Sequence, residues 1–527
     1  MASRAAATTA PTRFNPSTSC SSLIDIPNSP AGRLQSFYLI TLLPTNGSTN
    51  LYSPTIDFLR FFVFQGSLGS GLPELRLLFR SKQEKHARAP QLIFDKSERA
   101  ASVDERRVVG EIFGLEIPAD AQTLLSGGTD FLTAAFHTSG ALAPDNKVSR
   151  IVEAQEFLGG GTGKKLLLTV AYELPEPDLP AQLFIKFSRN FDNELWDRAR
   201  FMMISEANFA VLSRSPDFPV AVPACLFADV ESQSSTGLII TECITYGRNG
   251  VEALYPKCMD FTVPEPLEHY KAILTGLAKL SGTHRGGRLS PDFDKKFPYN
   301  RQQASAVFAI RTPQEKLIQR ANRMFDFVER YPKLFPQNVR APEFREQFIR
   351  DIPDLVAAEG RIREILYGNP EFIAFAHWNA NIDNCWFWRD AAGTLQCGFM
   401  DWANAGQISV AQSVSGAISG AEPFIWNEHL DELLTIFIQE YAARGGPRLG
   451  LDELRLHILL IVAVSGVAYA MGAPIAMERD IEDIGSLESY QDACFRQHEN
   501  ARIQLHMMTK MLNVWQTRKL GDVVRKL

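Results

Sequence analysis

Residues 376–406 read AHWNANIDNCWFWRDAAGTLQCGFMDWANAG, and this stretch sets the expectations for the rest of the chain. A polar loop at 379–384 is followed by two short apolar segments on either side of residues 389–394, a turn that contains a glycine. This pattern is typical of a β-hairpin. The hairpin would deliver Asp401 beside the loop that holds Asn384. A carboxylate and an amide oxygen placed together can share one hard cation such as Mg²⁺.

The same stretch resembles a known site. His377 and Asn384 stand at the two ends of an H-x-x-x-x-x-x-N segment, and Asp401 follows after the hairpin between a methionine and a tryptophan. This is similar to the catalytic and metal-binding segments of the aminoglycoside phosphotransferase and choline-kinase-like branch of the protein-kinase-like fold. The resemblance implies an α+β fold with a small β-rich N-lobe and a larger helical C-lobe. It also implies that ATP and Mg²⁺ are bound, with Asn384 and Asp401 as metal ligands and His377 as a brace for the loop.

One position of the loop departs from the family. The catalytic aspartate expected two residues after the histidine is Asn379 here. An asparagine cannot accept a proton at neutral pH, although its carbonyl can orient a hydroxyl. Asp383 is the nearest carboxylate in the sequence and would serve as the base if the loop turns it inward; the alternative is a loop-capping or solvent-facing aspartate. General-base assistance is worth about 10²–10⁴-fold, so a slow kinase without it agrees with this sequence.

A glycine-rich connection lies between two predicted strands at 151–157 and 165–172. It contains Gly159, Gly160, Gly161 and Gly163. Such a loop lets backbone N–H groups approach a phosphate closely. The spacing matches neither the Walker A pattern nor G-x-G-x-x-G, so a plain hairpin turn is the alternative. The resemblance favours a role in nucleotide binding, because the family has a similarly placed glycine-rich hairpin.

A lysine stands inside the next predicted strand. Lys186 lies between apolar residues of the strand at 183–187, and it needs an anionic partner if that face is covered. The predicted helix at 196–214 carries Glu206 within an apolar stripe. We therefore expect a Lys186–Glu206 pair, which in the kinase fold fixes the phosphate-binding lysine. The alternative is an exposed lysine and a glutamate at the rim of the helix.

Later segments extend the resemblance. The strand at 237–242 is similar to the one that leads into the hinge between the lobes, so Glu242 and Cys243 would line the nucleotide crevice. The amphipathic pattern at 270–284 predicts a long C-lobe helix. Residues 285–370, mixed helix and loop, would shape the acceptor pocket. Further helices are expected at 410–421, 428–443, 451–471 and 481–514.

These patterns divide the chain into three parts. Residues 1–105 form an N-terminal extension without a readable fold, residues 106–244 form the N-lobe with a leading helix at 129–140, and residues 245–520 form the C-lobe. Residues 1–24 are rich in serine, contain two arginines and lack acidic side chains. This composition fits a disordered tail or an organelle presequence.

Bulk properties exclude some classes of protein. A net charge of −6 argues against a nucleic-acid binder. The seven cysteines are scattered without a C-x-x-C pair, which favours free thiols and a cytoplasmic location, with an organelle as the alternative. The longest apolar run, 458–471, is shorter than the roughly 20 residues that cross a bilayer. We expect a buried core helix there, no membrane span and a soluble protein.

Three functions remain open to this sequence. The resemblance implies an ATP-dependent phosphotransferase acting on a hydroxyl of a small molecule. A nucleotide-binding pseudokinase without turnover is the alternative, because the base position is Asn379. A different nucleotide transfer, such as AMP transfer, or an unrelated enzyme is the third. No A-P-E segment is present, which disfavours a protein substrate. The sequence does not indicate which acceptor is used or what the oligomeric state is.

Overall fold

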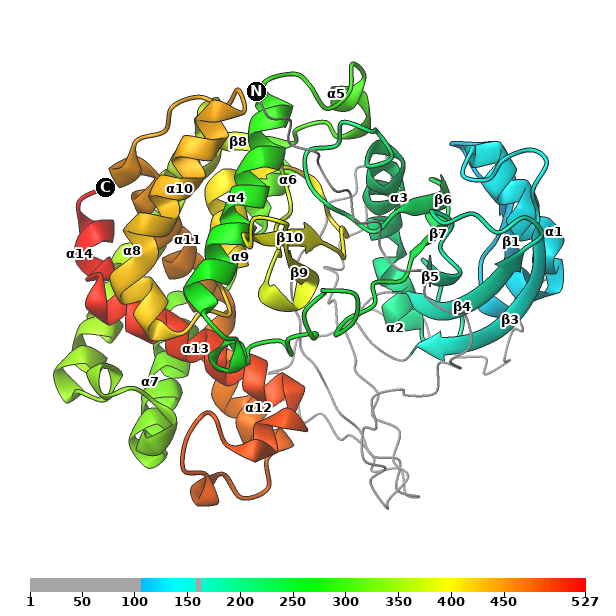
Figure 1. Ribbon diagram of the computed structural model, residues 1–527. Helices are drawn as coiled ribbons and strands as arrows, with labels where there is room; N and C mark the ends of the chain where they lie inside the picture. Colours follow the sequence, from blue (N-terminus) through cyan, green and yellow to red (C-terminus); the bar gives the residue numbers. More distant parts are fainter. Residues whose placement is uncertain (1–105, 158–162) are drawn as a thin grey trace, which may run out of the picture. The chain divides into compact units, whose positions relative to one another are not determined.

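The computed structural model describes residues 106–157 and 163–527, which all fall within one compact unit (Figure 1). The predictions for 1–105, and those for Gly159, Gly160 and Gly161, lie outside these ranges. The described chain begins with a two-stranded sheet of β1 (Arg107–Val109) and β2 (Glu116–Pro118). Helix α1 (Ala121–Ser139) follows where a leading helix was predicted; the side chain of Asp120 caps its start, and Gly140 ends it with a positive φ.

Five strands form one antiparallel sheet in the order β3-β4-β5-β7-β6. They are β3 (Val148–Phe157), β4 (Lys164–Tyr172), β5 (Gln182–Phe187), β6 (Cys225–Glu231) and β7 (Thr236–Glu242). Side chains alternate across a strand, so Leu166 and Ile185 pack into the core shared with α1. Their neighbours Lys165 and Lys186, which pair directly in the register, therefore point to the opposite face.

On the second face of the sheet, α3 (Met202–Leu212) packs against β6 and β7 (Figure 1). Met203 and Ala207 of this helix pack against Ala228 of β6. A single helix was predicted over 196–214, but the segment is divided into α2 (Glu194–Asp197), a 3₁₀ turn (Arg198–Phe201) and α3. The backbone keeps right-handed helical angles at Asp197, Phe201 and Met202, so the helical path continues through the tighter turn.

The central hairpin is formed as predicted, and a second strand pair, which was not predicted, lies beside it. Strands β9 (Cys385–Arg389) and β10 (Leu395–Phe399) pair antiparallel. The two ends of the quoted stretch are tied by β8 (Ile373–Ala376), which pairs with β11 (Gly406–Ser409). This second pairing closes a loop of chain, so that residues 377 and 405 are held near each other at its base.

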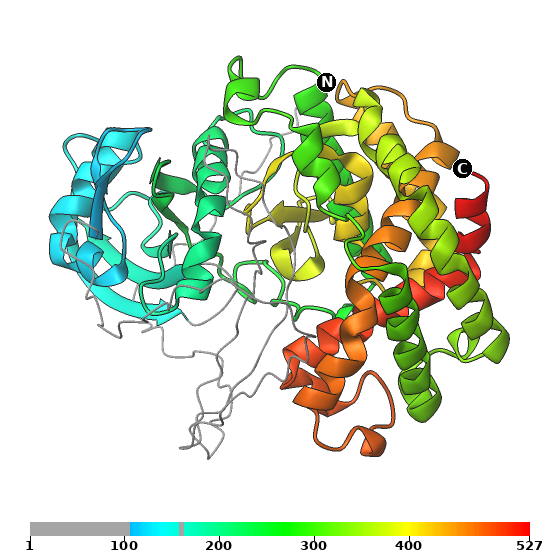
Figure 2. The same ribbon diagram turned by 180° about the vertical axis from the view of Figure 1, so that it is seen from behind.

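The rest of the described chain is largely helical, as Figure 2 shows from behind, and its helices share one large hydrophobic core. Its helices are α4 (Pro266–Arg285), α5 (Phe293–Lys296), α6 (Arg301–Ala306), α7 (Gln314–Arg330), α8 (Pro342–Gly368), α9 (Val410–Ala417), α10 (Leu430–Ala443), α11 (Leu451–Tyr469), α12 (Ala473–Asp480), α13 (Glu499–Thr517) and α14 (Leu520–Arg525). The sheet-bearing N-terminal part and the helical C-terminal part confirm the predicted α+β class with its two lobes. The domain boundary at 244 stays a prediction.

One of the predicted C-terminal helices begins later than expected, and the helix predicted from the apolar run is present. The helix expected over 481–514 starts only at Glu499, because short polar side chains such as Asp492 bind nearby backbone N–H groups and favour turns before it. The apolar run forms α11 as expected. Residues 451–480 are long and apolar enough to cross a membrane by length and composition, with a mean hydropathy of 2.1, and 72% of the apolar window is buried within the fold. This agrees with a core helix.

Candidate functional site

A buried ion pair connects strand β5 to helix α3. Lys186 Nζ lies 2.8 Å from both carboxylate oxygens of Glu206, and the two side chains are only 8% and 10% exposed. The pair forms because Lys186 occupies the sheet face that α3 covers. The predicted Lys186–Glu206 contact is therefore present, and the alternative of two exposed side chains is not.

Asp401 brings a second carboxylate to the same ammonium from the other end of the chain. Its Oδ1 lies 3.3 Å from Lys186 Nζ, while 51% of its side chain is exposed. Burial alone would lower the pKa of Lys186, but attraction to Glu206 and Asp401 raises it. Desolvation acts to raise the pKa of Asp401, and the attraction of Lys186 outweighs it and lowers that pKa to about 2. Lys186 and Asp401 are thus both charged at neutral pH.

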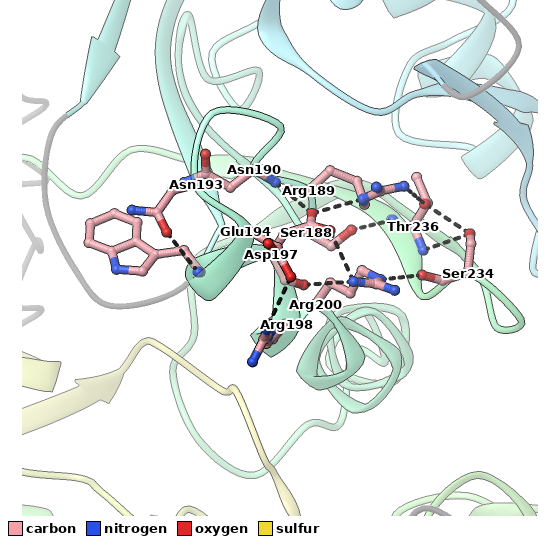
Figure 3. Close-up of polar contacts among 12 residues, drawn as sticks. Ser188, Arg189, Asn190, Asn193, Glu194, Asp197, Arg198, Arg200, Ser234 and Thr236 are labelled. Atoms are coloured by element: carbon pink, nitrogen blue, oxygen red, sulfur yellow. Dashed lines mark hydrogen bonds and ion pairs between the residues drawn. The ribbon is translucent and has the colours of Figure 1, made fainter. Parts of the chain in front are cut away.

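A network of polar contacts holds the end of β5 against the start of the helical segment that leads to Glu206 (Figure 3). Asp197 accepts hydrogen bonds from Arg189 Nε and from the backbone N–H of Asn190, each at 2.9 Å. Its other oxygen pairs with Arg200 at 2.9 Å. Arg189 follows Lys186 on the same chain segment. The network therefore fixes the spacing between the lysine and its glutamate.

His377 braces the loop at 379–384. The side chain is 1% exposed, its Nδ1 accepts the backbone N–H of Asn379 at 3.1 Å, and its Nε2 donates to the carbonyl of Met400 at 2.9 Å. Burial lowers the pKa of His377, so the ring is neutral. Both nitrogens are occupied, and the histidine acts by joining the loop to the residue that precedes Asp401.

Asn384 and Asp401 are positioned as the two candidate metal ligands. The Nδ2 of Asn384 donates to the carbonyl of Asn379 at 2.8 Å, which leaves its Oδ1 as the ligand atom. The backbone N–H of Met400 donates to the carbonyl of Asn384 at 3.0 Å and places Asp401 next to it. Asp401 adopts a left-handed conformation, with φ 57°, which costs a non-glycine residue of order 1 kcal/mol or more.

This donor set fits Mg²⁺. Both ligand atoms are hard oxygens, and Mg²⁺ is held in many sites by one or two carboxylates together with waters and substrate phosphates. Within the described ranges, no group of three or more histidine, cysteine, aspartate or glutamate side chains is suited to a metal. The candidate site thus offers two oxygen ligands from the chain, one from Asn384 and one from Asp401.

Asn379, at the family's base position, and Asp383, the candidate base, lie in different surroundings. Asn379 is half-buried, and its backbone N–H and carbonyl bind His377 and Asn384. Asp383 is instead paired with Lys257 at 3.1 Å, and its side chain is 14% exposed. Burial raises the pKa of Asp383, and the ammonium of Lys257 counteracts this effect. Asp383 is therefore not solvent-facing, because its side chain is largely buried and forms a salt bridge with Lys257.

Trp402 links the two halves of the site. Its indole stacks on the ring of Phe209, with centroids 3.8 Å apart and planes 15° apart. Its Nε1 donates to the carbonyl of Phe399 at 3.0 Å. Phe209 lies on α3, one turn after Glu206. The position of α3 and the position of Asp401 are therefore fixed by one aromatic contact.

The hinge residues and the end of the glycine-rich connection are engaged in the sheet. The carboxylate of Glu242 accepts the backbone N–H of Ala224 at 2.9 Å, and the backbone N–H of Cys243 donates to the carbonyl of Gln182 at 2.9 Å. Gly163 has φ +63°, and a Cβ there would lie 1.9 Å from the carbonyl oxygen of Phe187. Only glycine fits at this approach. A role for Glu242, Cys243 and Gly163 in binding a nucleotide stays a prediction.

Two lysines join the site that the sequence did not single out. Lys165 is 8% exposed and stands opposite Lys186 in the register. Burial and the nearby charge of Lys186 lower the pKa of Lys165 to about 8. Alternation along β4 could have placed Lys165 on this face. Lys257 lies in an irregular segment before α4, where no periodic pattern predicts its position.

No family model matches this sequence, and no curated protein matches it in sequence. Among solved structures the chain is similar to a choline kinase from Cryptosporidium parvum, with 12% identity, 70% of this chain and 89% of that chain covered, and a TM-score of 0.34. It is also similar to an ethanolamine kinase from Plasmodium vivax, with 13% identity, 79% and 95% covered, and a TM-score of 0.35.

A macrolide 2'-phosphotransferase of type I is similar as well, with 17% identity, 67% of this chain and 93% of that chain covered, and a TM-score of 0.29. The chemistry of this chain rests on its own geometry.

Proposed function

We propose that this chain is an ATP-dependent phosphotransferase of the aminoglycoside phosphotransferase and choline-kinase-like branch, acting on a hydroxyl of a small molecule. The observation that carries the proposal is the meeting of Asp401 with the buried Lys186–Glu206 pair, at 3.3 Å and 2.8 Å. A lysine fixed by a glutamate, next to an aspartate at the end of a hairpin, is the arrangement that phosphoryl transfer uses to hold phosphates and metal.

Each residue has a role in this proposal. Lys186 binds the α- and β-phosphates, and Glu206 orients its ammonium. Lys165, on the same sheet face, adds positive charge toward the phosphates. Asn384 and Asp401 hold Mg²⁺, which when bound neutralises charge on the transferring phosphate. The glycine-rich connection and the hinge at Glu242 and Cys243 contact the nucleotide through their main chain.

The loop orients the acceptor rather than deprotonating it. The side-chain oxygen of Asn379 can accept a hydrogen bond from the acceptor's hydroxyl, but it cannot take up the hydroxyl proton at neutral pH. Asp383 is held by Lys257 at 3.1 Å and would have to leave this salt bridge to serve as the base. We therefore propose slow turnover that relies on positioning and on electrostatic stabilisation. The six cysteines in the described ranges are free thiols, which fits a protein of a reducing compartment such as the cytoplasm.

A pseudokinase is the second candidate, and one specific observation favours it. The loop has no carboxylate at 379, and the one acid within residues 379–384, Asp383, is paired with Lys257. In that case the chain binds Mg-ATP but does not transfer its phosphate. The two candidates share every phosphate-binding residue and differ only in the fate of the nucleotide.

The test measures ADP production by the purified chain from Mg-ATP with a panel of hydroxylated small molecules. The matched variants are Asp401→Ala, at the site, and Asp178→Ala, at an exposed loop position. We expect acceptor-dependent ADP that falls at least about 100-fold in Asp401→Ala and is unchanged in Asp178→Ala. ATP binding without ADP for any acceptor selects the pseudokinase. A chain that does not bind ATP contradicts both candidates.

A further inference from the structure

Two lysines lie side by side on the face of the sheet that carries the buried ion pair. Lys165 of β4 stands directly opposite Lys186 of β5 in the register, so the two side chains leave the sheet on the same face. Like charges directly opposite each other on neighbouring strands destabilise a sheet. Lys165 is only 8% exposed, so solvent screens this repulsion less than it would at the surface. An anion bound beside both ammonium groups would offset the cost.

Lys165 also lies at the base of the glycine-rich connection. It follows Gly163 by two residues, and a Cβ on Gly163 would lie 1.9 Å from the carbonyl oxygen of Phe187, the residue after Lys186. This close approach holds the end of the connection against β5, next to the two lysines. In the proposed function both the connection and Lys186 contact the phosphates of the nucleotide. Phosphates in that position would therefore lie next to Lys165 as well.

The charges around the two lysines balance without a metal. Burial and the charge of Lys186 lower the pKa of Lys165 to about 8, although Asp401 and Glu206 attract its ammonium. Lys165 is therefore largely charged at pH 7. Two ammonium groups thus stand beside two carboxyl groups, and the cluster of these four side chains carries no net negative charge. A polyanion meets no net repulsion from it.

The candidate metal site offers little negative charge by comparison. It consists of one carboxylate, from Asp401, and one neutral amide oxygen, from Asn384. The carboxylate is shared, because its Oδ1 lies 3.3 Å from Lys186 Nζ. The acid of the loop at 379–384, Asp383, pairs with Lys257 at 3.1 Å. Few charges therefore attract a divalent cation here, whereas two ammonium groups are fixed on the sheet.

We propose that Lys165 neutralises much of the phosphate charge that Mg²⁺ would otherwise neutralise, so that the chain binds a nucleoside triphosphate tightly without a divalent cation. The inference deepens the proposed function and rests on it, because it takes the phosphates to lie against Lys186. A triphosphate is a polyanion, and its binding requires positive charge from a metal or from the protein. Lys165 and the metal then replace each other in part, and the loss of one makes binding depend on the other.

Calorimetric titration of the purified chain with ATP, at pH 7 and constant ionic strength, tests this dependence once with Mg²⁺ and once with EDTA. For the parent we expect the affinity without Mg²⁺ to lie within about tenfold of the affinity with it. Lys165→Met removes the ammonium and should bind Mg-ATP about tenfold more weakly than the parent. The same variant should bind metal-free ATP at least about 100-fold more weakly, because no cation then replaces the lost charge.

Lys147→Met is the matched control. Lys147 directly precedes β3 of the same sheet and pairs with Glu173 at 3.0 Å, with the two side chains 58% and 51% exposed. The change removes the same charge from the same region of the chain and should alter neither affinity. Thermal unfolding without ligand checks that Lys165→Met is folded. We expect its melting temperature to equal or exceed that of the parent, because a buried charge opposite another lysine is replaced by an apolar side chain.

Asp401→Asn provides a test that does not require a change at Lys165. Asparagine accepts the left-handed backbone that Asp401 adopts, with φ 57°, and the change removes the one carboxylate of the candidate metal site. We expect metal-free ATP to bind to this variant within about threefold of the parent, or more tightly, because the lost charge repels phosphate. The gain in affinity from Mg²⁺ should disappear.

Three outcomes overturn the inference. If the parent binds Mg-ATP but loses at least about 100-fold in affinity with EDTA, the metal is required, and the inference fails while the proposed function stands. If Lys165→Met weakens binding by the same factor with and without Mg²⁺, Lys165 does not replace the metal. If ATP binds in neither condition, the proposed function fails together with the inference.

Discussion

The cluster around Lys186 and the loop at 379–384 are built in opposite ways. In the cluster, Lys186 meets two carboxylates, Glu206 and Asp401, at 2.8 Å and 3.3 Å, in the arrangement that the family motif implies. In the loop, position 379 lacks a carboxylate, and Asp383 is held by Lys257 at 3.1 Å. The cluster gathers three charged groups, while the one acid of the loop is engaged in a salt bridge.

Under the proposed function, this difference separates the binding of a nucleotide from the acceptance of a proton. Phosphate and metal binding depends on fixed charges, which a buried ion pair supplies whether or not a reaction follows. Proton transfer adds about 10²–10⁴-fold and depends on a single side chain. A chain can lose that side chain and keep its phosphate site.

The largest expected effect is on stability, in Lys186→Met. The change leaves Glu206 buried, 10% exposed, without its ammonium. Removal of one member of a buried pair costs about 3–5 kcal/mol. We expect a loss of that size in the free energy of unfolding, measured by urea denaturation, with the exposed Lys295→Met unchanged. The double variant Lys186→Met/Glu206→Leu should regain most of the loss; if the single variant is as stable as the parent, the pair carries no buried charge.

The next effect concerns the loop. Asn379→Asp restores a carboxylate where the family has one, and we expect acceptor-dependent ADP production to rise about 10²-fold. Asp383→Asn keeps the shape of the side chain but removes its charge, and it should change the rate by less than about tenfold if Lys257 retains the residue in a structural role. A much larger loss in Asp383→Asn would instead identify it as the base. Steady-state rates at saturating Mg-ATP distinguish these results.

The smallest effect is a pH dependence of nucleotide affinity. Burial lowers the pKa of Lys165 to about 8, so its side chain is charged below pH 8 and neutral above it. A positive charge that contacts phosphate is therefore lost as the pH rises, and we expect Mg-ATP to bind about tenfold more weakly at pH 9 than at pH 7. Calorimetric titration across this range provides the measurement. Lys165→Met should bind weakly and with a flat profile, and an equally steep profile in the variant would show that another group titrates.

Much of the fold could be predicted because its signals are local. The hairpin around residues 389–394 follows from apolar runs and a glycine turn, and the strand with Lys186 follows from its apolar neighbours. The helix expected over 481–514 was wrong over its first half, where local side-chain bonds to the backbone outweigh the apolar pattern. The periodicity of apolar residues in a sequence does not indicate such hydrogen bonds.

The site was less predictable where it depends on contacts between distant segments. The Lys186–Glu206 pair could be inferred because each residue is a charge within an apolar pattern. The Lys257–Asp383 bridge could not, since it joins an irregular segment to a loop and no spacing relates the two. The stack of Trp402 on Phe209 also joins segments that are far apart in the sequence.

The helix-lining glycine at position 416 has a consequence for how this chain can vary. A Cβ on Gly416 of α9 would lie 2.0 Å from the carbonyl oxygen of Trp378, directly before Asn379. Any larger residue would push the loop away from the helix, and the loop carries the candidate base, a metal ligand and the brace of His377 together. A substitution at this apolar contact of α9 would then disturb all of these groups at once. The position of the loop at 379–384 therefore depends on the absence of a side chain at Gly416.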